Sequence, residues 1–319
     1  MLQLLYLYYD APRKDKESFD KNIDALRTQF KFIGENPQYV LIKKLYEVAF
    51  QNNPRLVLIP TEEQINAVTL DRVYQMFKER FSDASAQTFV FVGNVSDDDV
   101  QMISKYLGNL PCNGKQKGET WKNREPKFAP GVIHETVYKG TDNQGMLVMM
   151  GETKGFEPTF ENRMIINELS DAMEITALEI IREKMGGTYS PSVRADYEIL
   201  PTGKVTWMFY IGCDPDKADV IEAAALDILK KYAKKGPDKK TLNKVKEQLI
   251  HNRLKSKQNN SFWMGQIVGS YMYNESRDEW VNNYDQQVKA VTAKQIKDMA
   301  AKVLNFNNYT VVTLKPEKK

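Results

Sequence analysis

Hydrophobic and polar positions follow a regular succession of strand and helix patterns from residue 131 to the end of the chain. Apolar and polar residues alternate at VIHETVYK (132–139) and GMLVMMGE (145–152), which predicts two strands joined by the turn GTDNQ. The later patterns predict a helix over 158–184, strands over 189–199 and 203–213, helices over most of 216–234 and 238–303, and a strand over 309–315. This succession predicts an α+β fold with helices packed on one face of an antiparallel sheet.

Local signals mark the ends of two of these helices. Asp214 is a good N-cap and Pro215 is suited to the first helical position, so a helix should begin there. The pair Gly186-Gly187 should end the helix over 158–184, because glycine adopts positive φ without steric cost.

The sequence also contains an internal repeat. QINAVT at 64–69 and QVKAVT at 287–292 lie 223 residues apart, counting from residue 64 to residue 287. Each is followed by a helix pattern (70–81 and 293–304) and then by a β-rich segment (88–94 and 309–316). A shared order of signature, helix and strand predicts that the two stretches are duplicated structural units.

The repeat predicts the domain organisation. Residues 1–110 correspond to the back part of a unit whose front part is missing, and 131–319 form a complete α+β unit. Residues 111–130, rich in Gly, Pro, Asn and Lys, are predicted to be a linker. We therefore expect one complete domain preceded by an N-terminally truncated homologous one.

Composition excludes several classes of protein. Lys and Arg number 45 and Asp and Glu number 42, so the net charge of +3 gives no support for a nucleic-acid partner. No apolar run is long enough to span a membrane. Cys112 and Cys213 are too few for a disulfide framework and are interpreted as free thiols, which leaves the compartment undecided.

The two histidines do not predict a metal site. His134 in HETVY resembles part of the zinc pattern H-E-x-x-H, but Tyr138 takes the last position and the segment alternates as a strand. We interpret His134 as a surface strand residue and His251 as a solvated helix residue. No metal site and no cofactor-binding residue is therefore expected in this chain.

Arg182 and Tyr189 lie seven residues apart across the Gly-Gly break in IIREKMGGTYS. From the residues alone, Arg182 could pair with a nearby acid and Tyr189 could start a half-buried strand. A functional role for the pair does not follow from composition or spacing.

A family resemblance gives these two residues a possible role. IREKMGGTYS, preceded by a long helix and followed by the CDP helix start, resembles the insulinase/pitrilysin family of zinc metallopeptidases. TFVFVGNVSDDDV, YLGNLP and YYDAPRKDKESF are similar to its bacterial processing-protease branch, and the resemblance covers essentially the whole chain. It implies four homologous α+β domains in two halves that close like a clamshell, with this chain as the C-terminal half: the back of the third domain and the whole fourth.

The resemblance also implies the chemistry. The family's zinc is held by an H-x-x-E-H helix in the first domain, which this chain lacks, so zinc is expected in the parent protein only. The family's R-x-x-x-x-x-x-Y motif matches Arg182 and Tyr189. It implies that Tyr189 donates a hydrogen bond to the oxyanion or substrate carbonyl, and that Arg182 holds a substrate carbonyl oxygen.

We therefore expect the non-catalytic C-terminal half of a zinc endopeptidase, inactive alone, whose partners are the zinc-bearing half and peptide substrates. Two alternatives stay open: a natural non-zinc subunit of a two-chain peptidase, and a structural subunit without proteolytic role. The resemblance suggests a periplasmic or exported bacterial parent.

Overall fold

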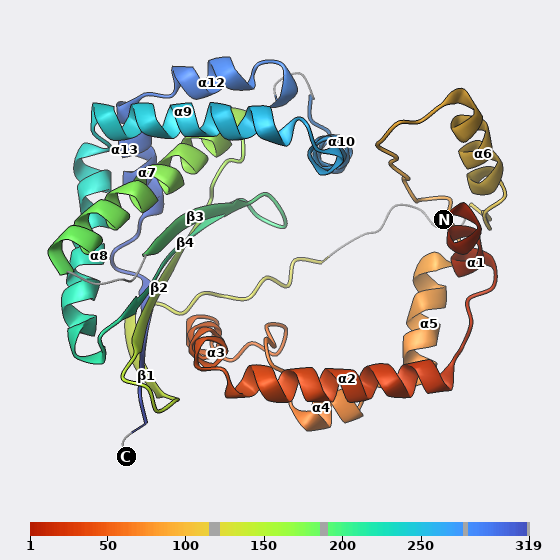
Figure 1. Ribbon diagram of the computed structural model, residues 1–319, viewed down its shortest axis with the longest axis horizontal. Coiled ribbons are helices and arrows are strands. Elements are labelled where there is room, and N and C mark those ends of the chain that lie inside the picture. Colours follow the sequence, from red (N-terminus) through yellow and green to blue (C-terminus); the bar gives the residue numbers. More distant parts are fainter. Residues whose placement is uncertain (115–121, 186–190, 277–279, 318–319) are drawn as a thin grey trace. The chain divides into compact units, whose positions relative to one another are not determined.

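The computed structural model describes residues 1–114, 122–185, 191–276 and 280–317, with the backbone alone for 182–185. The chain forms two compact units, each assembled from separate stretches of sequence (Figure 1). Unit 1 contains Met1–Phe32, Pro60–Asn123 and Lys257–Glu275, and unit 2 contains Ile33–Ile59, Arg124–Ser256 and Ser276–Lys319. Residues 33–59 are thus part of unit 2, most of which comes from later in the sequence. Residues 257–275 are part of unit 1, most of which comes from earlier in the sequence.

Unit 2 is built on a sheet with strand order β1-β5-β2-β4-β3 among the residues that the structure describes. Its strands are β1 (Val132–Tyr138), β2 (Gly145–Lys154), β3 (Ser192–Glu198), β4 (Lys204–Cys213) and β5 (Tyr309–Lys315). The α+β class is confirmed, and most strand pairs are antiparallel as expected. The β1–β5 pair is parallel, which the expected antiparallel sheet did not include. The last strand of the chain thereby lies between β1 and β2.

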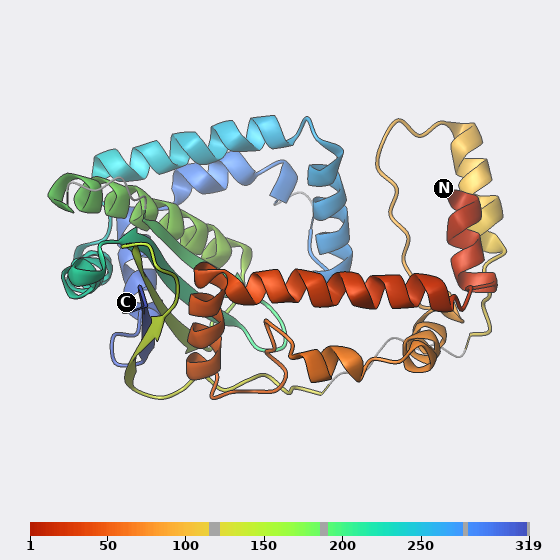
Figure 2. The ribbon, with the colours of Figure 1, turned by 60° about the horizontal axis from the view of Figure 1, so that its bottom comes forward.

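One face of this sheet carries the main core of unit 2. The helices on this side are α7 (Phe160–Met185), α8 (Ala218–Lys235), α9 (Lys239–Ser256), α12 (Tyr284–Ala290) and α13 (Ala293–Val303) (Figure 1 and Figure 2). Leu147 and Met149 of β2 point to this side, together with the fully buried Trp207 of β4. Asp214 caps the single 3₁₀ turn η1 (Pro215–Lys217) that leads into α8, as its sequence predicted.

The opposite face of the sheet is covered by α3 (Pro37–Ala49). Leu41 and Leu45 of α3 are fully buried in a second core that also contains Val148 of β2 and Val312 of β5. The helices predicted within 131–319 lie on one face, as expected, and the other face is covered by α3, which comes from an earlier part of the sequence. Alternation explains the second core, because neighbouring residues of β2 point to opposite faces.

Unit 1 contains helices and no assigned strand within its described residues. Its helices are α1 (Leu2–Asp10), the larger part of α2 (Lys16–Glu35), α4 (Glu62–Asn66), α5 (Leu70–Phe81), α6 (Asp97–Gly108) and α10 (Asn260–Tyr273). The strand expected over 88–94 is not formed. A strand requires a partner for its backbone groups, and the described residues of this chain provide none there.

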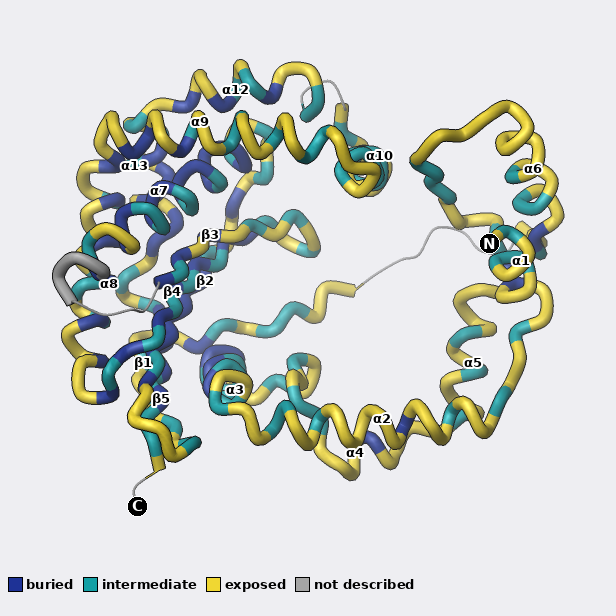
Figure 3. Tube along the Cα trace, viewed as in Figure 1, coloured by how far each residue is buried: buried dark blue, intermediate teal, exposed yellow. Residues whose placement is uncertain are grey.

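Helices of the two predicted repeat units match in order and spacing. Lys16 of α2 and Lys239 of α9 are 223 residues apart, as are Pro37 of α3 and Asn260 of α10. Leu70 of α5 and Ala293 of α13 show the same interval, and each of these two helices is capped by a threonine, Thr69 or Thr292. Matching helices nevertheless differ in how far they are buried. Most of the buried residues belong to unit 2 (Figure 3). No helix among the described residues has the length and apolar character needed to cross a membrane.

Candidate functional site

The predicted site residues lie at the connection between α7 and β3. Arg182 is in the last turn of α7, where the structure describes the backbone and not the side chain. Tyr189 lies outside the described residues, as does the Gly186-Gly187 pair. The proximity of Arg182 and Tyr189 therefore stays a prediction.

The two elements that carry this connection are firmly packed. Leu169, Met173 and Ala177 form a fully buried stripe along α7, and Ile181 continues it to the residue before Arg182. These positions are four residues apart, the spacing that places side chains on one face of a helix. The stripe holds the last turn of α7 against the core of unit 2.

β3 is tied to α7 by packing and by a hydrogen bond. The backbone amide of Ala195 donates to Ser170 Oγ of α7 at 3.0 Å, and Val193 is buried in the same core as Ile181. Both ends of the connection therefore rest on rigid elements, the arrangement that holds functional side chains to a defined geometry.

Two acidic residues of α7 have unusual electrostatics that sequence reasoning missed. Glu168 is fully buried, and neither of its carboxylate oxygens has a hydrogen-bond partner among the described residues. Burial raises the pKa of Glu168 to about 8, against the opposing effect of Lys246. Burial also raises the pKa of Asp171, one turn further on, to about 6. The sequence provided little signal for them, because α7 carries other charged residues such as Glu174 and Glu179, and the pattern does not tell which acids are buried.

A buried ionic cluster joins the segment before β1 to the sheet. Lys204 Nζ of β4 lies 3.2 Å from Glu125 Oε1 and 3.3 Å from Glu152 Oε2 of β2. Burial lowers the pKa of Lys204, but the carboxylates of Glu152, Glu125 and Glu198 more than offset this and raise it overall. Glu125, within the predicted linker, is therefore anchored to the sheet of unit 2.

The described residues do not fit a zinc site. No group of three or more His, Cys, Asp or Glu residues within them is placed to hold a metal ion. His134 is on β1, as predicted, where its Nε2 lies 2.8 Å from Glu222 Oε1 of α8. His251 is exposed on α9. Neither histidine belongs to a ligand set, and no catalytic step is assigned to a metal in this chain.

Comparison with known proteins links the chain to one peptidase family. The family description "Peptidase M16 inactive domain" matches residues 67–249. The Escherichia coli (strain K12) protein described as "Probable zinc protease PqqL" is 24% identical over 309 residues, covering 92% of this chain and 31% of that protein. This chain thus spans about a third of the length of that relative.

Solved structures share the fold. The crystal structure of the periplasmic protease PqqL from E. coli matches with a TM-score of 0.78 at 18% identity, over 95% of this chain and 33% of that one. The first half of the same E. coli protein also matches, with a TM-score of 0.72 at 14% identity, over 98% of this chain and 70% of that one. At these identities the structural matches establish the fold alone.

Proposed function

This chain belongs to the peptidase M16 family, and from that membership we propose that it is the non-catalytic half of a zinc-dependent endopeptidase. The supporting observation is the match of more than half of the chain to the family's inactive domain. The resemblance of IREKMGGTYS to the insulinase family points the same way. In this proposal the chain closes over a zinc-bearing half and binds peptide with it.

Two residues would contact the substrate. Tyr189 would donate its phenolic hydrogen bond to the oxyanion of the tetrahedral intermediate or to the substrate carbonyl, a stabilisation that is strongest where water is excluded. Arg182 would hold a substrate carbonyl oxygen by a charge-assisted hydrogen bond. The rigid packing of α7 and β3 supports this assignment, because it would fix both ends of the segment that carries them.

The partner would be a half that carries the H-x-x-E-H helix and the zinc. Such a half would have the same fold as this chain, which agrees with the match to the first half of the E. coli protein. That protein is described as periplasmic, and we place the parent of this chain in the periplasm by analogy.

Peptide cleavage by this chain combined with its zinc-bearing half tests the proposal. Tyr189→Phe removes only the phenolic oxygen, and loss of an oxyanion donor lowers kcat by about 10²–10³-fold. The matched control is Tyr138→Phe on β1, an exposed tyrosine outside the proposed site, which should leave kcat unchanged. Unchanged kcat in Tyr189→Phe would refute the assigned role, and full activity of this chain without the zinc half would refute the proposed division of labour.

A further inference from the structure

Lysines are concentrated where α8 ends and α9 begins. The segment 230–240 reads KKYAKKGPDKK and contains six lysines against a single acid, Asp238, although the net charge of the whole chain is only +3. We call these six residues the lysine patch: Lys230, Lys231, Lys234, Lys235, Lys239 and Lys240. All six are exposed, and none of them forms a salt bridge with a described residue. Positive charge is therefore concentrated on one part of unit 2 and is not neutralised there.

Several exposed lysines elsewhere in the chain are paired within their own helices. Lys294 Nζ of α13, for example, lies 2.6 Å from Asp298 Oδ2, one turn further along. Asp227 precedes the patch on α8 and Glu247 follows it on α9, but neither forms a salt bridge with it in the described structure. The patch is thus left available to an anion from outside the chain.

The buried sides of both helices fix the backbone beneath the patch. Leu229 and Tyr232 of α8 are buried in the core of unit 2, where Tyr232 Oη donates to the carbonyl oxygen of Ala172 at 2.6 Å. Leu242 and Val245 of α9 are buried in the same core. The lysines lie on the sides of the two helices that face away from this core.

The lysines of α8 and α9 form one continuous surface. Asp238 Oδ1 accepts a hydrogen bond from the backbone amide of Thr241 at 2.8 Å at the start of α9. This hydrogen bond lowers the pKa of Asp238, and the positive charge of Lys231 on α8 lowers it further. The charge of Lys231 therefore acts on the first turn of the next helix.

Helix dipoles explain only part of the patch. Lys234 and Lys235 are in the last turn of α8, where cations are favourable. Lys239 and Lys240 instead begin α9, where the helix dipole is positive and cations are unfavourable. Lysines four residues apart on a helix, such as Lys230 and Lys234, also repel each other. The patch therefore lowers the stability of the folded chain unless an anionic partner offsets the repulsion.

The composition of the patch favours lipid headgroups over other anionic partners. Segment 230–240 contains no arginine, and its single aromatic residue, Tyr232, is buried. Protein interfaces are enriched in arginine and aromatic residues and depleted in lysine, and single-stranded nucleic acids are bound by aromatic stacking. Clusters of about four to eight basic residues on amphipathic helices are instead typical of binding to anionic lipids.

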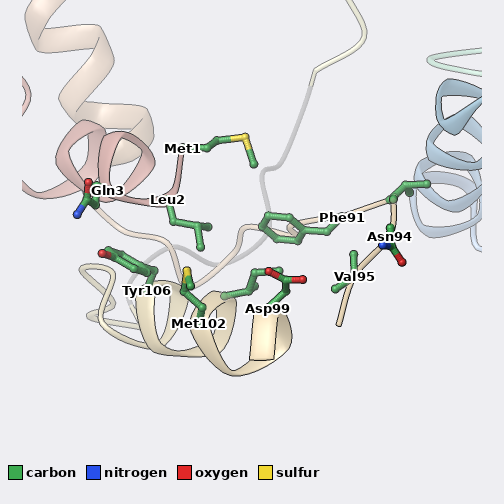
Figure 4. A pocket seen from close by; sticks show the side chains of 12 residues that line it. Met1, Leu2, Gln3, Phe91, Asn94, Val95, Asp99, Met102 and Tyr106 are labelled. Atoms are coloured by element: carbon green, nitrogen blue, oxygen red, sulfur yellow. The ribbon is translucent and has the colours of Figure 1, made fainter. Parts of the chain in front are cut away.

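The cavity of unit 1 has a different character. It has a volume of about 560 Å³ and is lined by residues 91–95 and by parts of α1 and α6 (Figure 4). Asp99 carries the only charged side chain among its lining residues, and this side chain belongs to the capping box of α6. This cavity therefore offers no positive charge to an anion, whereas the lysine patch does.

We propose that the lysine patch attaches unit 2 to an anionic phospholipid surface, with its ammonium groups against the headgroup phosphates. Each lysine close to such a surface strengthens binding about fivefold. The attraction extends only about 8–10 Å at physiological salt, so the lysines that face the surface supply it. This attachment does not depend on the proposed contacts of Arg182 and Tyr189.

Co-sedimentation of the 319-residue chain with phospholipid vesicles tests the proposal. Vesicles of phosphatidylcholine with about 30% phosphatidylglycerol should bind the chain, and vesicles of phosphatidylcholine alone should not. Raising the NaCl concentration from about 0.05 to 0.5 M should release the chain, because salt shortens the range of the attraction. Equal binding to the two kinds of vesicle, or binding to neither, would overturn the proposal. Tighter binding to poly-glutamate than to the anionic vesicles would assign the patch to an acidic protein instead.

A charge-neutralised variant locates the binding surface. Its four substitutions are Lys234→Gln, Lys235→Gln, Lys239→Gln and Lys240→Gln. It should bind the anionic vesicles at least ~50-fold more weakly, whereas arginine at the same four positions keeps the charge and should retain the binding. Circular dichroism should show the same helix content in both variants, because all four side chains are exposed.

The matched control makes the same change in net charge on unit 1. It replaces four exposed lysines by glutamine: Lys21, Lys31, Lys78 and Lys105. This control should bind the anionic vesicles as the unaltered chain does. Binding that is equally weak in the control and in the patch variant would show an effect of net charge alone and would overturn the proposal, as would unaltered binding by the patch variant.

Discussion

Replacing Glu168 by glutamine should change how the stability of unit 2 depends on pH. Glu168 is fully buried on α7, and its pKa is raised from 4.5 to about 8 by burial. The folded protein therefore keeps a proton on Glu168 at pH values where the unfolded chain has released it. Since the native state binds more protons, the free energy of unfolding should fall as pH rises between 4.5 and about 8.

The size of this effect follows from the two pKa values. One pKa unit corresponds to about 1.4 kcal/mol, so ionised Glu168 would cost the folded state about 5 kcal/mol above pH 8. At pH 7 the same values give a loss of about 3 kcal/mol relative to pH 4. Glutamine has nearly the same shape and no charge, so Glu168→Gln should remove this loss.

Urea unfolding followed by circular dichroism between pH 5 and 9 measures the effect, with stability taken from the midpoint and the slope. The difference between wild type and Glu168→Gln should be small at pH 5 and grow in favour of the variant toward pH 8. Glu179→Gln on the same helix is the matched control, because the side chain of Glu179 is exposed, and it should leave the pH dependence unchanged. Parallel pH profiles for wild type and Glu168→Gln would refute the reasoning.

Three further substitutions probe the packing of unit 2. Leu45→Ala removes a fully buried side chain of α3 and should destabilise unit 2 by about 2–5 kcal/mol in urea unfolding, whereas Leu26→Ala at a partly exposed position of α2 should cost much less. Lys204→Ala removes the closer ion-pair partner of the buried Glu152 carboxylate, leaving Lys154 at 4.0 Å, and should lower stability by about 3–5 kcal/mol; an effect below 1 kcal/mol would show that the cluster is not essential. Thr292→Ala removes the capping box of α13 and should cost about 1 kcal/mol, with Thr292→Ser retaining most of the stability.

Features that depend on local interactions were largely readable from the sequence. The repeat interval of 223 residues, found from QINAVT and QVKAVT, also separates the starts of matching helices in the structure. Asp214 caps its turn as predicted. The hydrogen bonds of a helix join residues only four apart. The residues that determine where a helix begins and ends therefore lie close to those ends in the sequence.

Pairing and burial between distant segments were decided only by the tertiary structure. The parallel β1–β5 pair joins segments that are far apart in the sequence, with Val132 opposite Tyr309, and α3 covers a sheet whose strands begin after residue 131. The pKa of Glu168 depends in the same way on what surrounds α7, because the sequence gives an acid but not its burial. Segment 88–92 shows the reverse case, since its sequence is that of a strand and the described chain supplies no partner. The hydrogen bonds of a strand and the desolvation of a side chain both depend on residues far away in the sequence. The pattern along the chain therefore could not predict the strand pairing or the burial of Glu168.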